Sequence, residues 1–77
     1  MLLQPAAEDI PVDPVELFGR EAPLVCEIGT GSGYFIKAIA EERPATDFLA
    51  VERHSASVRR AYNRLRRAKL TNVRIYH

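Results

Sequence analysis

The sequence has a single cysteine and only two histidines among its 77 residues. One cysteine excludes an internal disulfide, and we interpret Cys26, which lies in an apolar run, as a small buried residue rather than a reactive thiol. His54 and His77 lack a second His or a Cys at ligand spacing, so we predict no metal site.

Long apolar runs, internal repeats and low-complexity segments are also missing. No run approaches the roughly 20 apolar residues that a membrane span requires. The amino terminus lacks the basic and apolar regions of a secretory signal. These absences predict no membrane partner and a cytoplasmic protein, and the short length limits the chain to one small core.

Hydrophobic periodicity and turn residues divide the chain into alternating elements. Residues 1–12 show no period and are interpreted as a loose arm; Asp13 then caps a short helix that Gly19 ends. The further elements expected are a strand at Leu24–Ile28, a helix at Tyr34–Arg43 with apolar residues at 35, 36, 39 and 40, a strand at Asp47–Glu52, a helix capped by Ser55 with apolar residues at 58, 61, 62 and 65, and a strand at Val73–Tyr76.

This order predicts an α/β fold of the β-α-β-α-β type, with parallel strands and helices on both faces of a truncated sheet. In a doubly wound sheet the first strand is central, so Leu24–Ile28 would expose an unpaired apolar edge. We therefore expect that the chain is a fragment lacking a C-terminal half, or that a partner chain or self-association covers this edge.

Charge is segregated along the chain, although the net charge is only +1. Residues 1–52 hold ten acids and three bases, for a net charge of −7, and residues 53–77 hold eight bases and no acid, for a net charge of +8. Such a block suits a polyanion-binding surface, because Lys and Arg displace counterions from phosphates. The candidate RNA contacts are Arg59, Arg60, Arg64 and Arg67. A solvated helix face is the equally weighted alternative.

Three alternating glycines follow the first expected strand, in the run Glu27-Ile28-Gly29-Thr30-Gly31-Ser32-Gly33. Their position between a strand and a helix favours a ligand-binding loop over an ordinary tight turn. A dinucleotide fingerprint would place its third glycine where Tyr34 stands, and a Walker loop would require Gly-Lys-Ser/Thr. The spacing alone leaves the ligand open. Tyr34 itself, like Tyr62, is interpreted as a packing residue.

The pattern acidic-x-Gly-x-Gly-x-Gly resembles the S-adenosylmethionine loop of class I methyltransferases. The resemblance implies a Rossmann-like class I methyltransferase half-fold, with an arm and short helix at 1–23 and a cofactor-binding half at 24–77. It also implies S-adenosylmethionine as the cofactor, bound by Glu27, Gly29, Thr30, Gly31, Ser32, Gly33, Glu52, Arg53 and His54.

The two glutamates have distinct expected roles. Glu27 would suit the cationic methionine end of the cofactor, and Glu52, 19 residues after Gly33, would accept the ribose hydroxyls. The alternatives are a structural salt bridge for Glu27 and a solvated strand-end acid for Glu52.

Several runs resemble, in order, the bacterial tRNA (guanine-N7-)-methyltransferases. They are Val25–Gly33, Arg43-Pro44, Asp47–Glu52 followed by His54, Ser57-Val58, Leu65, and Leu70-Thr71-Asn72-Val73-Arg74. The resemblance implies methyl transfer to guanine N7 of tRNA. That atom keeps an in-plane lone pair at neutral pH, so the enzyme's task would be alignment and desolvation rather than deprotonation.

In that family the residues that contact adenine, guanine and tRNA come after the third strand, beyond His77. The catalytic residues are therefore unknown, and we expect the 77-residue chain alone to be inactive. The alternative from another class is a non-catalytic nucleotide- or RNA-binding module completed by a partner chain.

Overall fold

The computed structural model describes residues 2–3 and 13–77, which form a four-stranded sheet with three helices. In chain order the elements are β1 (Leu2–Leu3), α1 (Pro14–Phe18), β2 (Leu24–Ile28), α2 (Tyr34–Glu42), β3 (Asp47–Val51), α3 (Ser55–Arg67) and β4 (Val73–Tyr76). The strand order is β1-β2-β3-β4, and β2, β3 and β4 run parallel. The predicted α/β fold with a truncated parallel sheet is confirmed.

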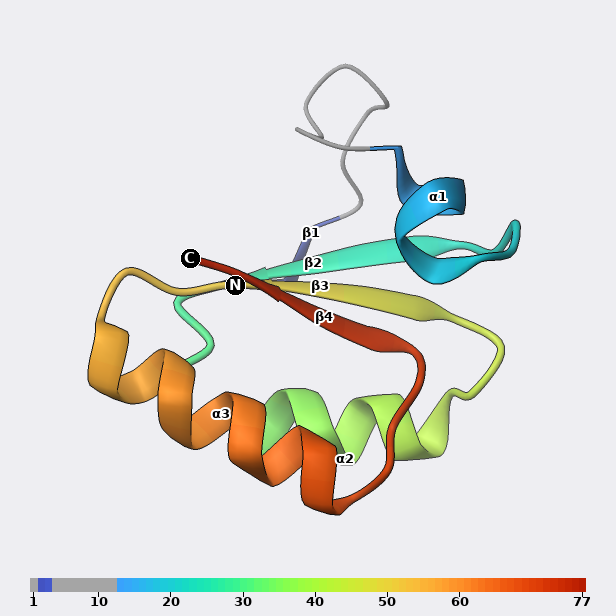
Figure 1. Cartoon of the computed structure of the whole chain (residues 1–77). Coiled ribbons are helices and arrows are strands. Elements are labelled where there is room, and N and C mark those ends of the chain that lie inside the picture. The colour runs from blue at the N-terminus through green and yellow to red at the C-terminus, as the bar shows by residue number, and fades with distance from the viewer. Residues whose placement is uncertain (1, 4–12) are drawn as a thin grey trace.

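The two crossover helices lie on the same face of the sheet. Figure 1 shows α2 and α3 below the strands and α1 above them. The expectation of crossover helices on both faces is therefore wrong. Both crossovers step in the same direction, from β2 to β3 and from β3 to β4, and right-handed connections that step the same way place their helices on one face.

The outer edge of β2 is partly covered by β1. Leu2 pairs with Glu27 and Leu3 with Cys26, in antiparallel register. The prediction of an unpaired edge is wrong at these two positions, as is the interpretation of Leu2 and Leu3 as loose; residues 4–12 of that arm lie outside the described part of the chain. An added antiparallel strand engages backbone groups that a bare edge would expose to other chains.

The core fills the space between the sheet and helices α2 and α3. Ile36 and Phe48 are fully buried, and the other buried members of the cluster are Ala40, Ala50, Leu65 and Val73. They occupy part of the predicted helical stripes and, through Phe48 and Ala50, one face of the buried strand β3. Phe35 and Tyr62, which were expected on those stripes, are instead more than half exposed.

The helix ends follow the predicted caps, with one exception. Asp13 Oδ1 accepts a hydrogen bond from the Val15 N–H at 3.0 Å, and Gly19 ends α1 in the left-handed conformation. Ser55 does not cap α3 as expected, because it is already the first helical residue. The cap position belongs to His54, whose backbone is extended.

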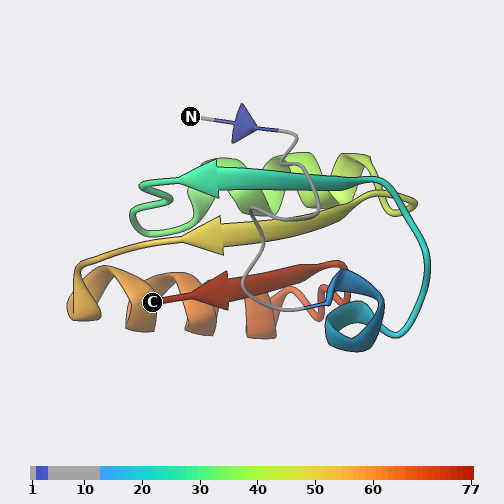
Figure 2. The same ribbon diagram turned by 90° about the horizontal axis from the view of Figure 1, so that it is seen from above.

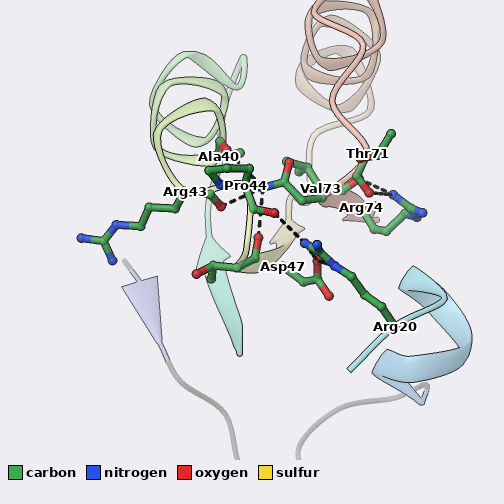
Figure 3. A network of polar contacts seen from close by, with 10 residues as sticks. Arg20, Ala40, Arg43, Pro44, Asp47, Thr71, Val73 and Arg74 are labelled. Atoms are coloured by element: carbon green, nitrogen blue, oxygen red, sulfur yellow. Dashed lines mark hydrogen bonds and ion pairs between the residues drawn. The ribbon is translucent and has the colours of Figure 1, made fainter. Parts of the chain in front are cut away.

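A polar network ties together the amino end of the sheet (Figure 3). Arg20 donates to Asp47 Oδ1 through Nε at 3.0 Å and Nη2 at 2.6 Å, and Nη2 also donates to the Pro44 carbonyl at 2.8 Å. Asp47 is buried at the start of β3. This buried charge is thus paired with the segment that leads from α1 into β2.

Asn72, which directly precedes β4, closes the carboxyl end of α2. Its Nδ2 donates to the carbonyls of Ala40, Arg43 and Thr46 at 3.0–3.1 Å. The Ala40 carbonyl would ordinarily accept from the N–H four residues on, but that residue is Pro44, which has none. Asn72 therefore supplies the donor that the proline removes.

Candidate functional site

The glycine loop, residues 29–33, and the end of β3 meet at the carboxyl edge of the sheet. In Figure 2 the arrowheads of β2, β3 and β4 point to one side, where the loop into α2 and the turn into α3 lie. The Gly29 and Thr30 N–H groups donate to the Val51 carbonyl at 2.8 and 3.4 Å. Open α/β sheets bind ligands at this edge.

The three loop glycines all have positive φ, but for different structural reasons. A Cβ added to Gly29 (φ 72°) or Gly31 (φ 60°) would meet nothing within 4 Å, so both face open space. A Cβ added to Gly33 (φ 84°) would lie 3.0 Å from Ala61 Cβ. Gly33 thus allows the start of α2 to pack against α3, while the first two glycines leave the backbone accessible to a ligand.

Glu52 is the polar centre of the site and is only 5% exposed. Its Oε1 accepts from the Gly31 N–H at 2.8 Å, and its Oε2 accepts from the N–H groups of Arg53 and His54, each at 3.0 Å. Because a carboxylate accepts about four hydrogen bonds, room for one more donor remains, on Oε1. This burial rules out the alternative of a solvated strand-end acid.

The same hydrogen bonds fix the charge of Glu52. Donation from the His54 and Gly31 N–H groups lowers the pKa of this carboxyl below its ordinary value, against the opposing effect of burial. Glu52 is therefore ionised at neutral pH. The pKa of Glu52 is lower in the folded state than in the unfolded state, so its ionisation stabilises the fold at pH values above the ordinary pKa of glutamic acid. This stabilisation is lost as the pH falls through the pKa of the folded state.

Glu27 lies on β2, the neighbour of β3, and is buried one residue before the strand ends. Its Oε1 accepts a hydrogen bond from the Thr30 hydroxyl, which is also buried. Among residues 2–3 and 13–77, no cation lies within ion-pair distance of Glu27. The structural salt bridge considered for this residue is therefore not formed within the described part.

Ser32 connects the loop to α3, a link that the sequence did not reveal. Arg64 Nε donates to the Ser32 carbonyl at 2.9 Å, and Arg60 Nε donates to the Ser32 hydroxyl at 3.3 Å. The Arg64 guanidinium also lies 3.4 Å from the centre of the Tyr34 ring. Tyr34 is 69% exposed, so the packing predicted for this side chain is against the Arg64 guanidinium at the surface and not in the core. Tyr34 and Arg64 are 30 residues apart in the sequence, so no local pattern predicted this contact.

The other predicted residues surround this centre at the surface. Arg53 and His54 are exposed and contribute their backbone N–H groups, while His77 Nε2 lies 3.0 Å from the Arg53 carbonyl oxygen. Arg59 and Arg67 are exposed on α3. Cys26 is buried as expected, and burial raises the pKa of its thiol.

Two further properties concern the described residues as a whole. No three His, Cys, Asp or Glu side chains within 2–3 and 13–77 are placed to hold a metal ion. Along the same ranges, each helix is too short or too polar to cross a membrane.

Sequence comparison defines the class to which this site belongs. The model of the family described as "Putative methyltransferase" matches residues 21–77, from the segment before β2 to the end of β4. The chain belongs to this methyltransferase family. The glycine loop and Glu52 are thus the part of a methyltransferase domain that the fold places at the carboxyl edge of the sheet.

The relatives narrow the resemblance. The chain is 51% identical over 67 residues to the tRNA (guanine-N(7)-)-methyltransferase of Thermus thermophilus, covering 87% of this chain and 22% of the relative. It is 44% identical over 68 residues to the protein of the same name from Saccharophagus degradans, covering 88% and 30%. It is 42% identical over 74 residues to the protein of the same name from Methylococcus capsulatus, covering 96% of this chain and 31% of the relative. The resemblance to this group is confirmed, and the chain spans less than a third of these relatives' length.

Proposed function

We propose that this chain is the cofactor-binding part of an S-adenosylmethionine-dependent tRNA (guanine-N7-)-methyltransferase. The observation that carries the proposal is the buried, ionised Glu52 beside two glycines that face open space, in a chain of a methyltransferase family. The identity with relatives of that name supports the substrate, tRNA, and the acceptor atom. The part that would hold guanine then lies in the remaining two thirds or more of the protein's length, which this chain does not cover.

The residues present fit S-adenosylmethionine. This cofactor has no pyrophosphate, so it requires no cluster of cations, whereas its ribose and its cationic methionine end both favour acids. Glu52 keeps one acceptor position for a ribose hydroxyl, and Glu27, with Thr30, lies on the neighbouring strand β2. At Gly29 and Gly31 the backbone faces open space, so the cofactor can approach the loop there.

The cofactor supplies an electrophilic methyl group, and the residues of this chain bind and orient it. Glu52 holds Gly31 in place by accepting a hydrogen bond from its N–H group. Guanine N7 needs no proton removed before it accepts a methyl group, so no general base is required from these residues. The contribution of this half is alignment, which in well-oriented reactions accounts for a large part of the rate.

Replacing Glu52 with alanine should weaken S-adenosylmethionine binding by about tenfold to a hundredfold, as expected when hydrogen bonds to a charged group are lost. Isothermal titration calorimetry on the protein that carries this chain, expressed whole, measures this directly. Glu42→Ala is the matched control, because Glu42 is an exposed acid at the far end of α2. Equal affinities for the two variants would remove Glu52 from the site.

The acceptor atom can be tested with the RNA itself. Methyl transfer from labelled S-adenosylmethionine is measured with a tRNA transcript and with the same transcript made with 7-deazaguanine, which has carbon in place of N7. The proposal requires transfer to the first and none to the second. Binding of tRNA without binding of S-adenosylmethionine would instead favour the non-catalytic binding module.

The basic face of α3 is the proposed contact for tRNA phosphates. Among the four candidates, Arg60 and Arg64 already donate to Ser32, whereas Arg59 and Arg67 are exposed and form no ion pair with any described residue. Shallow depressions of about 400 and 170 Å³ lie along this face, lined in part by Arg59 and by Arg67 respectively. A guanidinium at such a site suits bidentate contact with phosphate.

We expect the double variant Arg59→Gln/Arg67→Gln to reduce the slope of log affinity for tRNA against log salt concentration by roughly one for each arginine. Filter binding over a range of salt concentrations gives the slope. Arg43→Gln provides the control, because Figure 3 shows the Arg43 guanidinium pointing away from the amino-end network. If the double variant and the control share one slope, the basic face is a solvated helix surface.

A further inference from the structure

We propose that Arg64 is a positioning residue for the cofactor loop rather than mainly a phosphate contact, an inference that rests on the proposed function. Arg64 reaches both sides of Gly33: its Nε donates to the carbonyl of the preceding residue, Ser32, at 2.9 Å, and its guanidinium stacks on the ring of the following residue, Tyr34, 3.4 Å from the ring centre. A single side chain of α3 therefore fixes the junction between the loop and α2.

The loop needs such a restraint because its glycines give it little conformational preference of its own. Gly29, Gly31 and Gly33 all have positive φ, and glycine visits both signs of φ with similar ease. Glu52 holds one point of the loop, the Gly31 N–H. Arg64 holds a second, the Ser32 carbonyl, on the other side of the loop tip. An anion at the end of β3 and a cation on α3 thus clamp the tip between them.

The surroundings of Arg64 support this role. Ala61 packs against Gly33, and Arg60 donates to the Ser32 hydroxyl, so one side of α3 faces the loop. Arg64 is half-buried there, whereas Arg67, less than one turn further along, is exposed. Both line the same depression of about 170 Å³, so they differ in contact with the loop more than in electrostatic environment.

The consequence is that Arg64 acts on the cofactor through the backbone. A loop held in the binding conformation binds its ligand without a further loss of conformational freedom. Loss of the guanidinium would release the Ser32 carbonyl and the Tyr34 ring, and the loop would then have to be ordered at the expense of cofactor affinity.

The test compares Arg64→Gln with Arg67→Gln in the whole protein, since each removes one charge from the same depression. Arg64→Gln should raise the dissociation constant for S-adenosylmethionine about tenfold, the size expected for one charge-assisted hydrogen bond, and Arg67→Gln should change it less than twofold. Arg64→Lys keeps the charge but lacks the planar fork, so it should not restore affinity. Full restoration by lysine, or equal effects at both positions, would overturn the proposal.

Amide hydrogen exchange separates this inference from the proposed function, because it needs no ligand. Exchange at Gly31 and Gly33 should accelerate at least about tenfold in Arg64→Gln, with β3 unchanged, while Arg67→Gln leaves both amides as they are. Where Arg64→Gln does not fold, Tyr34→Leu, which removes the stacked ring but leaves the hydrogen bond from Arg64 to Ser32, should show a smaller acceleration at the same amides. If the protein fails to bind S-adenosylmethionine but the two variants still differ in exchange at Gly31 and Gly33, the proposed cofactor is refuted and the positioning role of Arg64 stands. If exchange at these amides is the same in Arg64→Gln and Arg67→Gln, the positioning role alone is refuted.

Discussion

Replacing Gly33 with alanine should lower the free energy of unfolding by about 2–4 kcal/mol, combining the cost of a left-handed backbone with that of overpacking. The new Cβ would lie 3.0 Å from Ala61 Cβ and 3.1 Å from Ala61 Cα, and the latter belongs to a helix backbone that cannot move aside cheaply. Denaturant unfolding followed by circular dichroism measures the loss.

Two variants isolate the steric part of this effect. Gly29→Ala has a similar φ of 72° but meets nothing within 4 Å, so only the backbone cost, about 1–2 kcal/mol, should appear. In the second, Ala61→Gly removes the opposing Cβ from α3, and combining it with Gly33→Ala should give a favourable coupling of about 1 kcal/mol or more. Strict additivity of the pair would show that α2 and α3 are not in contact at this point.

Replacing Asn72 with alanine should destabilise the chain by about 2–4 kcal/mol, since one buried donor group serves three carbonyls and the loss of a partner costs roughly 1–3 kcal/mol for each buried group. Ala40 is the most sensitive of the three acceptors, because Pro44 cannot replace the lost donor. Thermal or denaturant unfolding reports the change.

Asn72→Asp sharpens this prediction. It preserves size but turns the donor into an acceptor that faces carbonyl oxygens, so it should be at least as damaging as alanine at neutral pH. Asn63→Ala, at a half-buried position of α3, is the control and should be neutral or slightly stabilising, given the helix propensity of alanine. An Asn72→Ala variant as stable as this control would mean that water satisfies the end of α2 equally well.

The elements themselves were predictable because they depend on local patterns. The glycine loop, Pro44 and the apolar stripes lie within a few residues of the boundaries that they set, and the observed strands and helices from residue 24 onward follow them closely. The placement of Glu52 beside the glycine loop was predictable for the same reason, since Glu52 directly follows β3 and stands 19 residues after Gly33.

The features that the sequence did not predict are contacts between segments that are distant in the chain. Arg64 and Ser32 are 32 residues apart, as are Asn72 and Ala40, and neither pair leaves a periodic signal in the sequence. The face on which each crossover helix packs depends on the direction in which strands are added, which the order of elements alone did not fix. Leu2 and Leu3 pair with β2 through backbone groups, which carry no sequence signature.

Residues that stabilise the fold and residues of the candidate site lie at opposite ends of the sheet. Arg20, Asp47 and Asn72 act at the amino end, whereas Gly31 and Glu52 act at the carboxyl end, about one strand length or roughly 16 Å away. Changes that far apart without shared partners combine almost independently. A lineage moving to hotter or colder surroundings could therefore retune the first end and leave ligand recognition at the second untouched.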